Sequence, residues 1–196
     1  LILGLGGSVM PTALLAIDAE MHIDTVELDP AVLKVARSHF GYREDARLHS
    51  HVADARVFVR QQRRAKAQYD LVLIDAFDKD YIPEHLLTRE FLQQVQSLLT
   101  PSGVLAANTF ATGKLARHEA ATYQAVFGQL YQVDMDGGNR ILLAGRNALP
   151  PLAKFPGAFG ILELKEGGVL PVTLRNVEAK LPVANLQLPA ANAHRF

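Results

Sequence analysis

The chain opens with an apolar run that leads directly into a glycine-rich turn, and this feature constrains the fold more than any other. Residues 1–3 read as a buried strand, and the turn Gly4-Leu-Gly6-Gly7-Ser8 precedes a helix that begins near Pro11. A second strand, 23–28, carries Glu27 near its carboxyl end, about twenty residues further on. Strand, glycine turn, helix and acid-tipped strand in this order predict a parallel α/β unit. Such glycines let a ligand approach the backbone, and such an acid suits the hydroxyls of a ribose.

Strand-like and helix-like segments continue to alternate beyond this unit. The further strands that we expect are 48–52, 70–75 and 104–108, followed by a hairpin of 131–135 and 140–144. Alternation of this kind predicts parallel strands with helices on both faces of the sheet. A closing hairpin is typical of the Rossmann-like fold of S-adenosylmethionine-dependent methyltransferases. We therefore predict an α/β protein with a doubly wound, seven-stranded, mostly parallel sheet.

The regular alternation ends after residue 147. Prolines crowd between Pro150 and Pro189, with glycines among them. We expect a nucleoside-binding domain at 1–147 and a Pro/Gly-rich carboxyl-terminal extension at 148–196, which packs on that domain or on a second subunit. The chain starts inside a strand and lacks an initiator methionine, so we expect it to be part of a longer protein.

Charge and composition disfavour several classes of function. Twenty basic and twenty acidic residues cancel, which argues against a nucleic acid or an anionic membrane as partner. The absence of cysteine excludes a disulfide framework and a cysteine nucleophile. His49 and His51 share a strand face without an apparent third ligand, so we expect no metal. No apolar run is long enough for a membrane span and no signal peptide opens the chain, so we expect a cytoplasmic protein.

Acidic residues gather where the strand 70–75 runs out into a loop. Asp75 ends this strand, Asp78 follows three residues later, and Asp80 and Glu84 complete the group. Ligands of doubly wound sheets bind at the carboxyl ends of the strands. A carboxylate at such an end attracts an ammonium group and can take a proton as the amine becomes a nucleophile. Asp75 is therefore the candidate catalytic residue, and the other acids are either substrate ligands or part of a solvated loop.

Two other acids stand at strand ends in the same way. Glu27 is the candidate ribose ligand, with a surface acid as the alternative. Asp54 precedes a helix that begins near Arg56. Its carboxylate either accepts a hydrogen bond from an adenine amino group or caps that helix.

With these residues placed, the chain resembles the spermidine synthase family, the polyamine aminopropyltransferases. The resemblance covers roughly residues 1–145. It is carried by the segments Leu3-Gly-Leu-Gly-Gly-Ser8, Val26-Glu-Leu-Asp-Pro30, Val52-Ala-Asp-Ala55, Tyr69-Asp-Leu-Val-Leu-Ile-Asp-Ala-Phe-Asp78, Thr88-Arg-Glu-Phe91 and Leu99-Thr-Pro-Ser-Gly103.

The resemblance implies decarboxylated S-adenosylmethionine as co-substrate, a small cationic amine as acceptor, and a homodimer. It places the nucleoside of the co-substrate at the turn glycines, with Glu27 on the ribose, Leu28 against the adenine, and Asp54 with Ala55 at the adenine edge. Asp75 becomes the base that deprotonates the attacking amine. Asp78 and Tyr81 become polyamine ligands.

The chain also departs from the family pattern. Gly7 stands where true spermidine synthases carry an acid, and Asn108-Thr-Phe-Ala-Thr-Gly113 replaces the tyrosine–proline segment expected after the fifth strand. The loop around Asp78 differs as well, and the family's amino-terminal β-hairpin domain is not in this chain. A methyltransferase that uses intact S-adenosylmethionine, or a non-catalytic binding domain, therefore stays open as an alternative.

Overall fold

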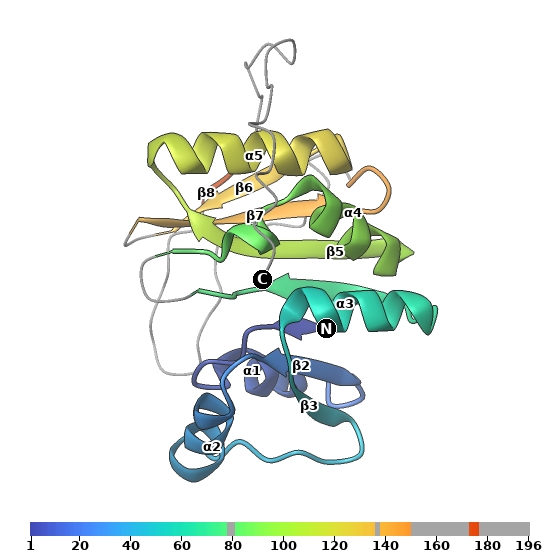
Figure 1. Ribbon diagram of the computed structural model, residues 1–196, viewed down its shortest axis with the longest axis vertical. Helices are drawn as coiled ribbons and strands as arrows, with labels where there is room; N and C mark the ends of the chain where they lie inside the picture. The colour runs from blue at the N-terminus through green and yellow to red at the C-terminus, as the bar shows by residue number, and fades with distance from the viewer. Residues whose placement is uncertain (78–80, 136–137, 150–172, 177–196) are drawn as a thin grey trace, which may run out of the picture.

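A single twisted sheet carries helices on both of its faces (Figure 1). The computed structural model describes residues 1–77, 81–135, 138–149 and 173–176. The strands are β1 (Ile2–Leu3), β2 (Ile23–Glu27), β3 (Leu48–Val52), β4 (Tyr69–Ile74), β5 (Leu99–Phe110), β6 (Tyr131–Asp134), β7 (Asn139–Gly145) and β8 (Thr173–Asn176). The helices are α1 (Val9–Ile17), α2 (Pro30–His39), α3 (Ala55–Arg64), α4 (Arg89–Leu98) and α5 (Gly113–Phe127), with a short 3₁₀ helix, η1, at Glu84–Leu86.

The strand order confirms the predicted fold class. Within the described residues the strands run β3-β2-β1-β4-β5-β7-β6-β8 across the sheet. The strands from β3 to β5 in this order pair in parallel, whereas β7 lies antiparallel to both β5 and β6. The first seven strands in the chain are those that the sequence predicts. The short β8, which lies in the predicted carboxyl-terminal extension, adds an antiparallel strand beside β6.

Two hydrophobic cores lie on opposite faces of the sheet, because successive side chains of a strand point to opposite sides. Leu3 and Val72 belong to the core that packs against α3, α4 and α5. Ile2 and Leu73, their neighbours in the chain, pack toward α1 and α2. A strand that is buried on both faces reads as a continuous apolar run, which is the pattern that identified β1 and β4 in the sequence.

Local signals set the beginnings of several helices. The Asp29 side chain accepts a hydrogen bond from the Ala31 N–H, with Pro30 at the first helical position of α2. Thr88 caps α4 by accepting from the Phe91 N–H.

The predicted length of β5 was too short, because the strand begins at Leu99 rather than at residue 104. The pairing of β4 with β5 shifts register between Tyr69 and Leu71, which takes up the Pro-Ser-Gly segment inside the strand.

Some expectations fall on parts of the chain that the structure does not describe. Asp78 and most of the extension 148–196 lie outside the described residues. Among the residues that are described, no helix has the length and apolar character needed to cross a membrane.

Candidate active site

The carboxyl ends of β1, β2 and β4 bring the glycine turn, Glu27 and Asp75 to one edge of the sheet. β1 lies between the other two strands, with Leu3 opposite Val26 on one side and opposite Ile74 on the other. The Gly4 N–H donates to the Val26 carbonyl at 2.8 Å, and the Asp75 N–H donates to the Leu3 carbonyl at 2.8 Å. The chain segments that follow β1, β2 and β4 therefore begin next to one another, as the parallel pairing predicts.

Gly4 is where the turn requires glycine most strongly. Its φ of +100° is rare for residues with a side chain. A Cβ built on Gly4 would stand 2.2 Å from the Asp75 carbonyl oxygen, which is backbone and cannot move aside. The glycine turn and the end of β4 are thus packed against each other, and the conformation of one depends on the other.

We expect Gly4→Ala to destabilise the protein by roughly 2–5 kcal/mol, because backbone strain and the steric clash with β4 add together. Gly6→Ala is the matched control. Gly6 also has a positive φ, +52°, but open space surrounds the position of its missing Cβ. Urea unfolding of the two variants measures the difference. Equal losses of stability would contradict the close approach between Gly4 and β4.

The Glu27 carboxylate is tied to the backbone around it. Oε2 accepts from the Leu5 N–H in the glycine turn at 3.1 Å, and Oε1 accepts from the Asp29 N–H at 3.0 Å. Each carboxylate oxygen has a second lone pair for a further donor. The next side chain, Leu28, is 65% exposed and presents its apolar surface to solvent. An anchored acid and an apolar surface thus lie side by side at the end of β2.

Asp54 caps α3, as one of the two interpretations of the sequence expects. Its Oδ1 accepts from the Val57 N–H at 2.9 Å, and Ala55, which follows it, is buried. His85 was not among the predicted site residues, yet its Nε2 contacts Asp54 Oδ2 at 2.8 Å. Burial alone would raise the pKa of Asp54, but the hydrogen bonds from Val57 and His85 outweigh it and lower that pKa below its ordinary value. The adenine contact of Asp54 remains a prediction.

Asp75 is exposed at the end of β4 and, among the described residues, accepts one side-chain hydrogen bond. Asn108 at the end of β5 donates from Nδ2 to Asp75 Oδ1 at 2.9 Å. Asn139 at the start of β7 donates from Nδ2 to Asn108 Oδ1 at 3.2 Å. Neither asparagine was among the predicted site residues, although Asn108, like Asp75, is a polar residue at the carboxyl end of a predicted strand. Tyr81, predicted as a substrate ligand, is 52% exposed beyond the loop.

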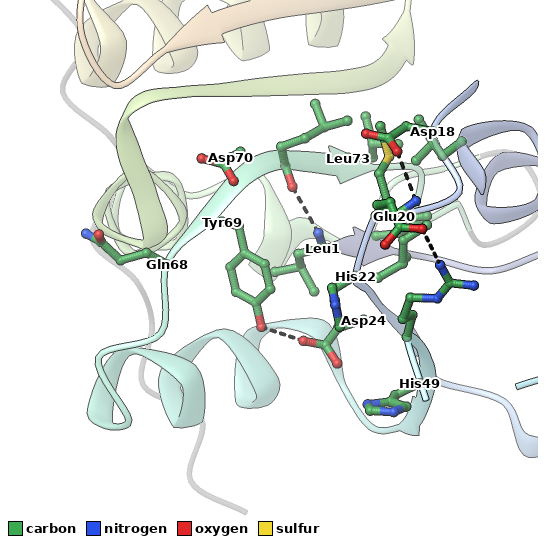
Figure 2. A pocket seen from close by; sticks show the side chains of 16 residues that line it. Leu1, Asp18, Glu20, His22, Asp24, His49, Gln68, Tyr69, Asp70 and Leu73 are labelled. Atoms are coloured by element: carbon green, nitrogen blue, oxygen red, sulfur yellow. Dashed lines mark hydrogen bonds and ion pairs between the residues drawn. The ribbon is translucent and has the colours of Figure 1, made fainter. Parts of the chain in front are cut away.

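A cavity of about 650 Å³ lies at the opposite, amino-terminal edge of the same strands (Figure 2). Its lining includes Ile23, Asp24, Tyr69 and Asp70, which begin β2 and β4. The Tyr69 hydroxyl points to Asp24 and donates to its Oδ2 at 2.9 Å. The residues predicted to bind ligand do not line this cavity, so it is separate from the candidate active site.

Strand order, glycine turn and acidic strand ends define a Rossmann-like protein of the methyltransferase type. The chain belongs to the spermine/spermidine synthase family, since residues 1–133 match the family described as "Spermine/spermidine synthase domain". The polyamine aminopropyltransferase of Vibrio vulnificus is 45% identical over 152 residues, which are 76% of this chain and 51% of that protein. The human eEF1A lysine and N-terminal methyltransferase is 32% identical over 147 residues, 70% of this chain and 21% of that protein.

The chain thus spans about half of the length of the first of these relatives and about a fifth of the second. Among solved structures, human methyltransferase-like protein 13 in complex with SAH superposes with a TM-score of 0.70 at 30% identity, covering 80% of this chain and 74% of that one. Spermidine synthase from Thermotoga maritima superposes with a TM-score of 0.67 at 22% identity, covering 81% and 57%. The second likeness concerns the fold alone.

Proposed function

We propose that this chain is the nucleoside-binding part of an aminopropyltransferase, which moves the aminopropyl group of decarboxylated S-adenosylmethionine to an amine of a polyamine. One observation carries the proposal. Asp75 lies at the carboxyl end of β4 beside the glycine turn and Glu27, in a chain that is 45% identical to a protein named polyamine aminopropyltransferase. A carboxylate beside a nucleoside site is what an attacking amine needs in order to lose its proton.

The nucleoside in this proposal lies over the ends of β1 and β2. Glu27 accepts from the ribose hydroxyls with the lone pairs that its two backbone hydrogen bonds leave available. The adenine covers the exposed side chain of Leu28, which supports the assignment because it would remove a large apolar surface from water. Asp54 and Ala55 take the adenine edge, and the turn glycines Gly4, Gly6 and Gly7 admit the ligand close to the backbone.

The proposed reaction is a direct displacement at carbon. The acceptor nitrogen forms a bond to the aminopropyl carbon next to the sulfonium, and the carbon–sulfur bond breaks with its electron pair going to sulfur. Methylthioadenosine leaves, and the new secondary amine gives its extra proton to Asp75. Asp78 and Tyr81 hold the distal part of the amine. The protein accelerates the step mainly by aligning nitrogen with sulfonium and by removing the proton, and no metal takes part.

Methyl transfer from intact S-adenosylmethionine is the second candidate function. It is favoured by Gly7, which replaces the family's acid in the turn. A carboxylate at that position would repel the methionine carboxylate that only the intact compound has, and glycine does not. The 30% identity to human methyltransferase-like protein 13, solved with SAH, points the same way. A binding domain without activity is the remaining alternative.

The proposal also covers the oligomeric state, the cellular location and the partners of the enzyme. We propose a homodimer in the cytoplasm that acts on a small cationic amine and binds neither nucleic acid nor a membrane. The equal numbers of acidic and basic residues support the last two points.

A product assay on the protein in its full natural form tests the proposal. The protein receives decarboxylated or intact S-adenosylmethionine in parallel reactions with a panel of diamines and polyamines, and the products are identified by mass spectrometry. We expect methylthioadenosine together with an aminopropylated amine, formed only from the decarboxylated compound. S-adenosylhomocysteine formed only from the intact compound would establish the methyltransferase instead. Nucleoside binding without either product would indicate a binding domain.

A further inference from the structure

Two side-chain amides form a chain of hydrogen bonds that ends at Asp75, the candidate base. Asn139 Nδ2 donates to Asn108 Oδ1 at 3.2 Å, and Asn108 Nδ2 donates to Asp75 Oδ1 at 2.9 Å. Both asparagines are half-buried, whereas Asp75 is exposed. Among the described residues, the second carboxylate oxygen, Asp75 Oδ2, has no hydrogen-bond partner.

The direction of these hydrogen bonds follows from the chemistry of the three groups. An ionised carboxylate can only accept hydrogen bonds, so Asn108 must turn its NH₂ group toward Asp75. Its carbonyl oxygen then faces Asn139 and accepts from the NH₂ group of that residue. Rotating either amide by half a turn would set two acceptors or two donors against each other.

The antiparallel direction of β7 makes this contact possible. Because β7 runs opposite to β5, its first residue, Asn139, reaches the same edge of the sheet as the last residues of β5. Asn139 pairs with Phe110, and Asn108 pairs with Ile141, so the two asparagines are diagonal neighbours on adjacent strands. The Ala111 N–H donates to the Gly138 carbonyl at 2.8 Å and holds this end of the strand pair together.

We propose that Asn139 and Asn108 form an amide relay that positions the Asp75 carboxylate, engaging Oδ1 so that Oδ2 faces the acceptor amine. The relay rests on the proposed function, because it serves Asp75 as the base. Asn108 acts directly on Asp75, and Asn139 acts through Asn108 by fixing the orientation of its amide. Both are positioning residues.

Asn139→Asp tests the relay by reversing its polarity. A carboxylate at position 139 accepts from the Asn108 amide, which therefore turns its carbonyl oxygen toward Asp75. We expect kcat to fall about 10- to 100-fold, the effect of losing one hydrogen bond to a charged group. KM for the nucleoside co-substrate is expected to stay within about twofold, since Glu27 and Leu28 are untouched.

Three further variants distinguish the loss of the relay from the effect of an added charge and from a general effect on the structure. Asn139→Leu removes the donor without adding charge and should still lower kcat. Asn139→His restores a donor and should recover most of the activity. Asn147→Asp makes the same charge change beyond the far end of β7, where the side chain donates to the Pro101 carbonyl; its kcat should equal that of the wild type. Equal kcat values for Asn139→Asp and wild type would overturn the relay while leaving the proposed function intact.

A measurement that does not depend on enzymatic activity distinguishes a failure of the relay from a failure of the proposed function. In ¹⁵N-labelled protein, the side-chain NH₂ resonances of Asn108 should shift in Asn139→Asp and in Asp75→Asn, but not in Asn147→Asp. Unchanged Asn108 resonances in the first two variants would overturn the relay. If these shifts occur but the wild type transfers no aminopropyl or methyl group, the proposed function fails and the relay survives as a structural arrangement.

Discussion

Asp75→Asn is expected to lower kcat for group transfer about 10²- to 10⁴-fold, the range that a positioned general base contributes. The substitution removes the charge and the proton acceptor at nearly constant volume. The fold should persist, because the side chain is exposed and, within the part of the chain that the structure describes, makes one side-chain hydrogen bond, to Asn108. Steady-state kinetics at saturating co-substrate and amine measures the loss.

Asp70→Asn supplies the matched control at the other end of the same strand. Asp70 begins β4 and accepts from the Thr100 hydroxyl at 2.8 Å, on the sheet edge away from the glycine turn. Its substitution should leave kcat within about twofold of the wild type, since no atom of the proposed site is changed. An Asp75→Asn variant as active as this control would refute the assignment of Asp75 as the base.

The largest expected effect on stability belongs to Arg140, a buried cation that joins α5 to the sheet. Its guanidinium donates to the Thr109 hydroxyl on β5 at 3.0 Å, to Gln132 Oε1 on β6 at 3.2 Å and to the Ala116 carbonyl on α5. Glu119 on α5 is its ionic partner, with 3.7 Å between Nη2 and Oε2. Burial raises the pKa of Glu119 to about 7, although the charge of Arg140 acts to lower it.

We expect Arg140→Met to destabilise the fold by about 3–5 kcal/mol at neutral pH, because Glu119 loses its counter-charge and must take up a proton to stay buried. The buried acceptors on β5, β6 and α5 also lose the donors that the guanidinium supplies. The double variant Arg140→Met with Glu119→Gln should recover part of the loss, since the side chain at 119 is then neutral without taking up a proton. Arg37→Met is the control. Arg37 also pairs with a glutamate, Glu44, but its side chain is 49% exposed, so the cost should stay below about 1 kcal/mol. Chemical denaturation measures all three, and a loss for Arg140→Met no greater than that of the control would contradict the prediction.

The parts of the fold that were predicted correctly depend on residues close together in the sequence. Asp29 and Pro30 begin α2 because an acceptor side chain and a fixed φ act within one turn of helix. The apolar runs of β1 and β4 reflect burial on both faces of a parallel sheet. The edge shared by Gly4, Glu27 and Asp75 follows from parallel pairing, which places the carboxyl ends of neighbouring strands together.

Other contacts at the site could not be predicted because they join residues that are far apart in the chain. His85 reaches Asp54 across 31 positions, and its segment, η1, shows no periodic pattern that would fix its position. The boundary of β5 was missed for a different reason. The Pro101-Ser102-Gly103 segment has the composition of a turn, yet the register shift opposite Tyr69 and Leu71 accommodates it within the strand.

The sequence by itself determined the class of fold and the edge of the sheet where chemistry is expected, because periodicity, caps and glycine positions act over a few residues. Tertiary structure alone decided which side chains meet there. Asn139 approaches Asp75 only because β7 is inserted antiparallel beside β5, and Glu119 meets Arg140 only because α5 packs over those strands. The order of the strands across the sheet is a property of the whole chain's packing, and no local pattern of residues encodes it.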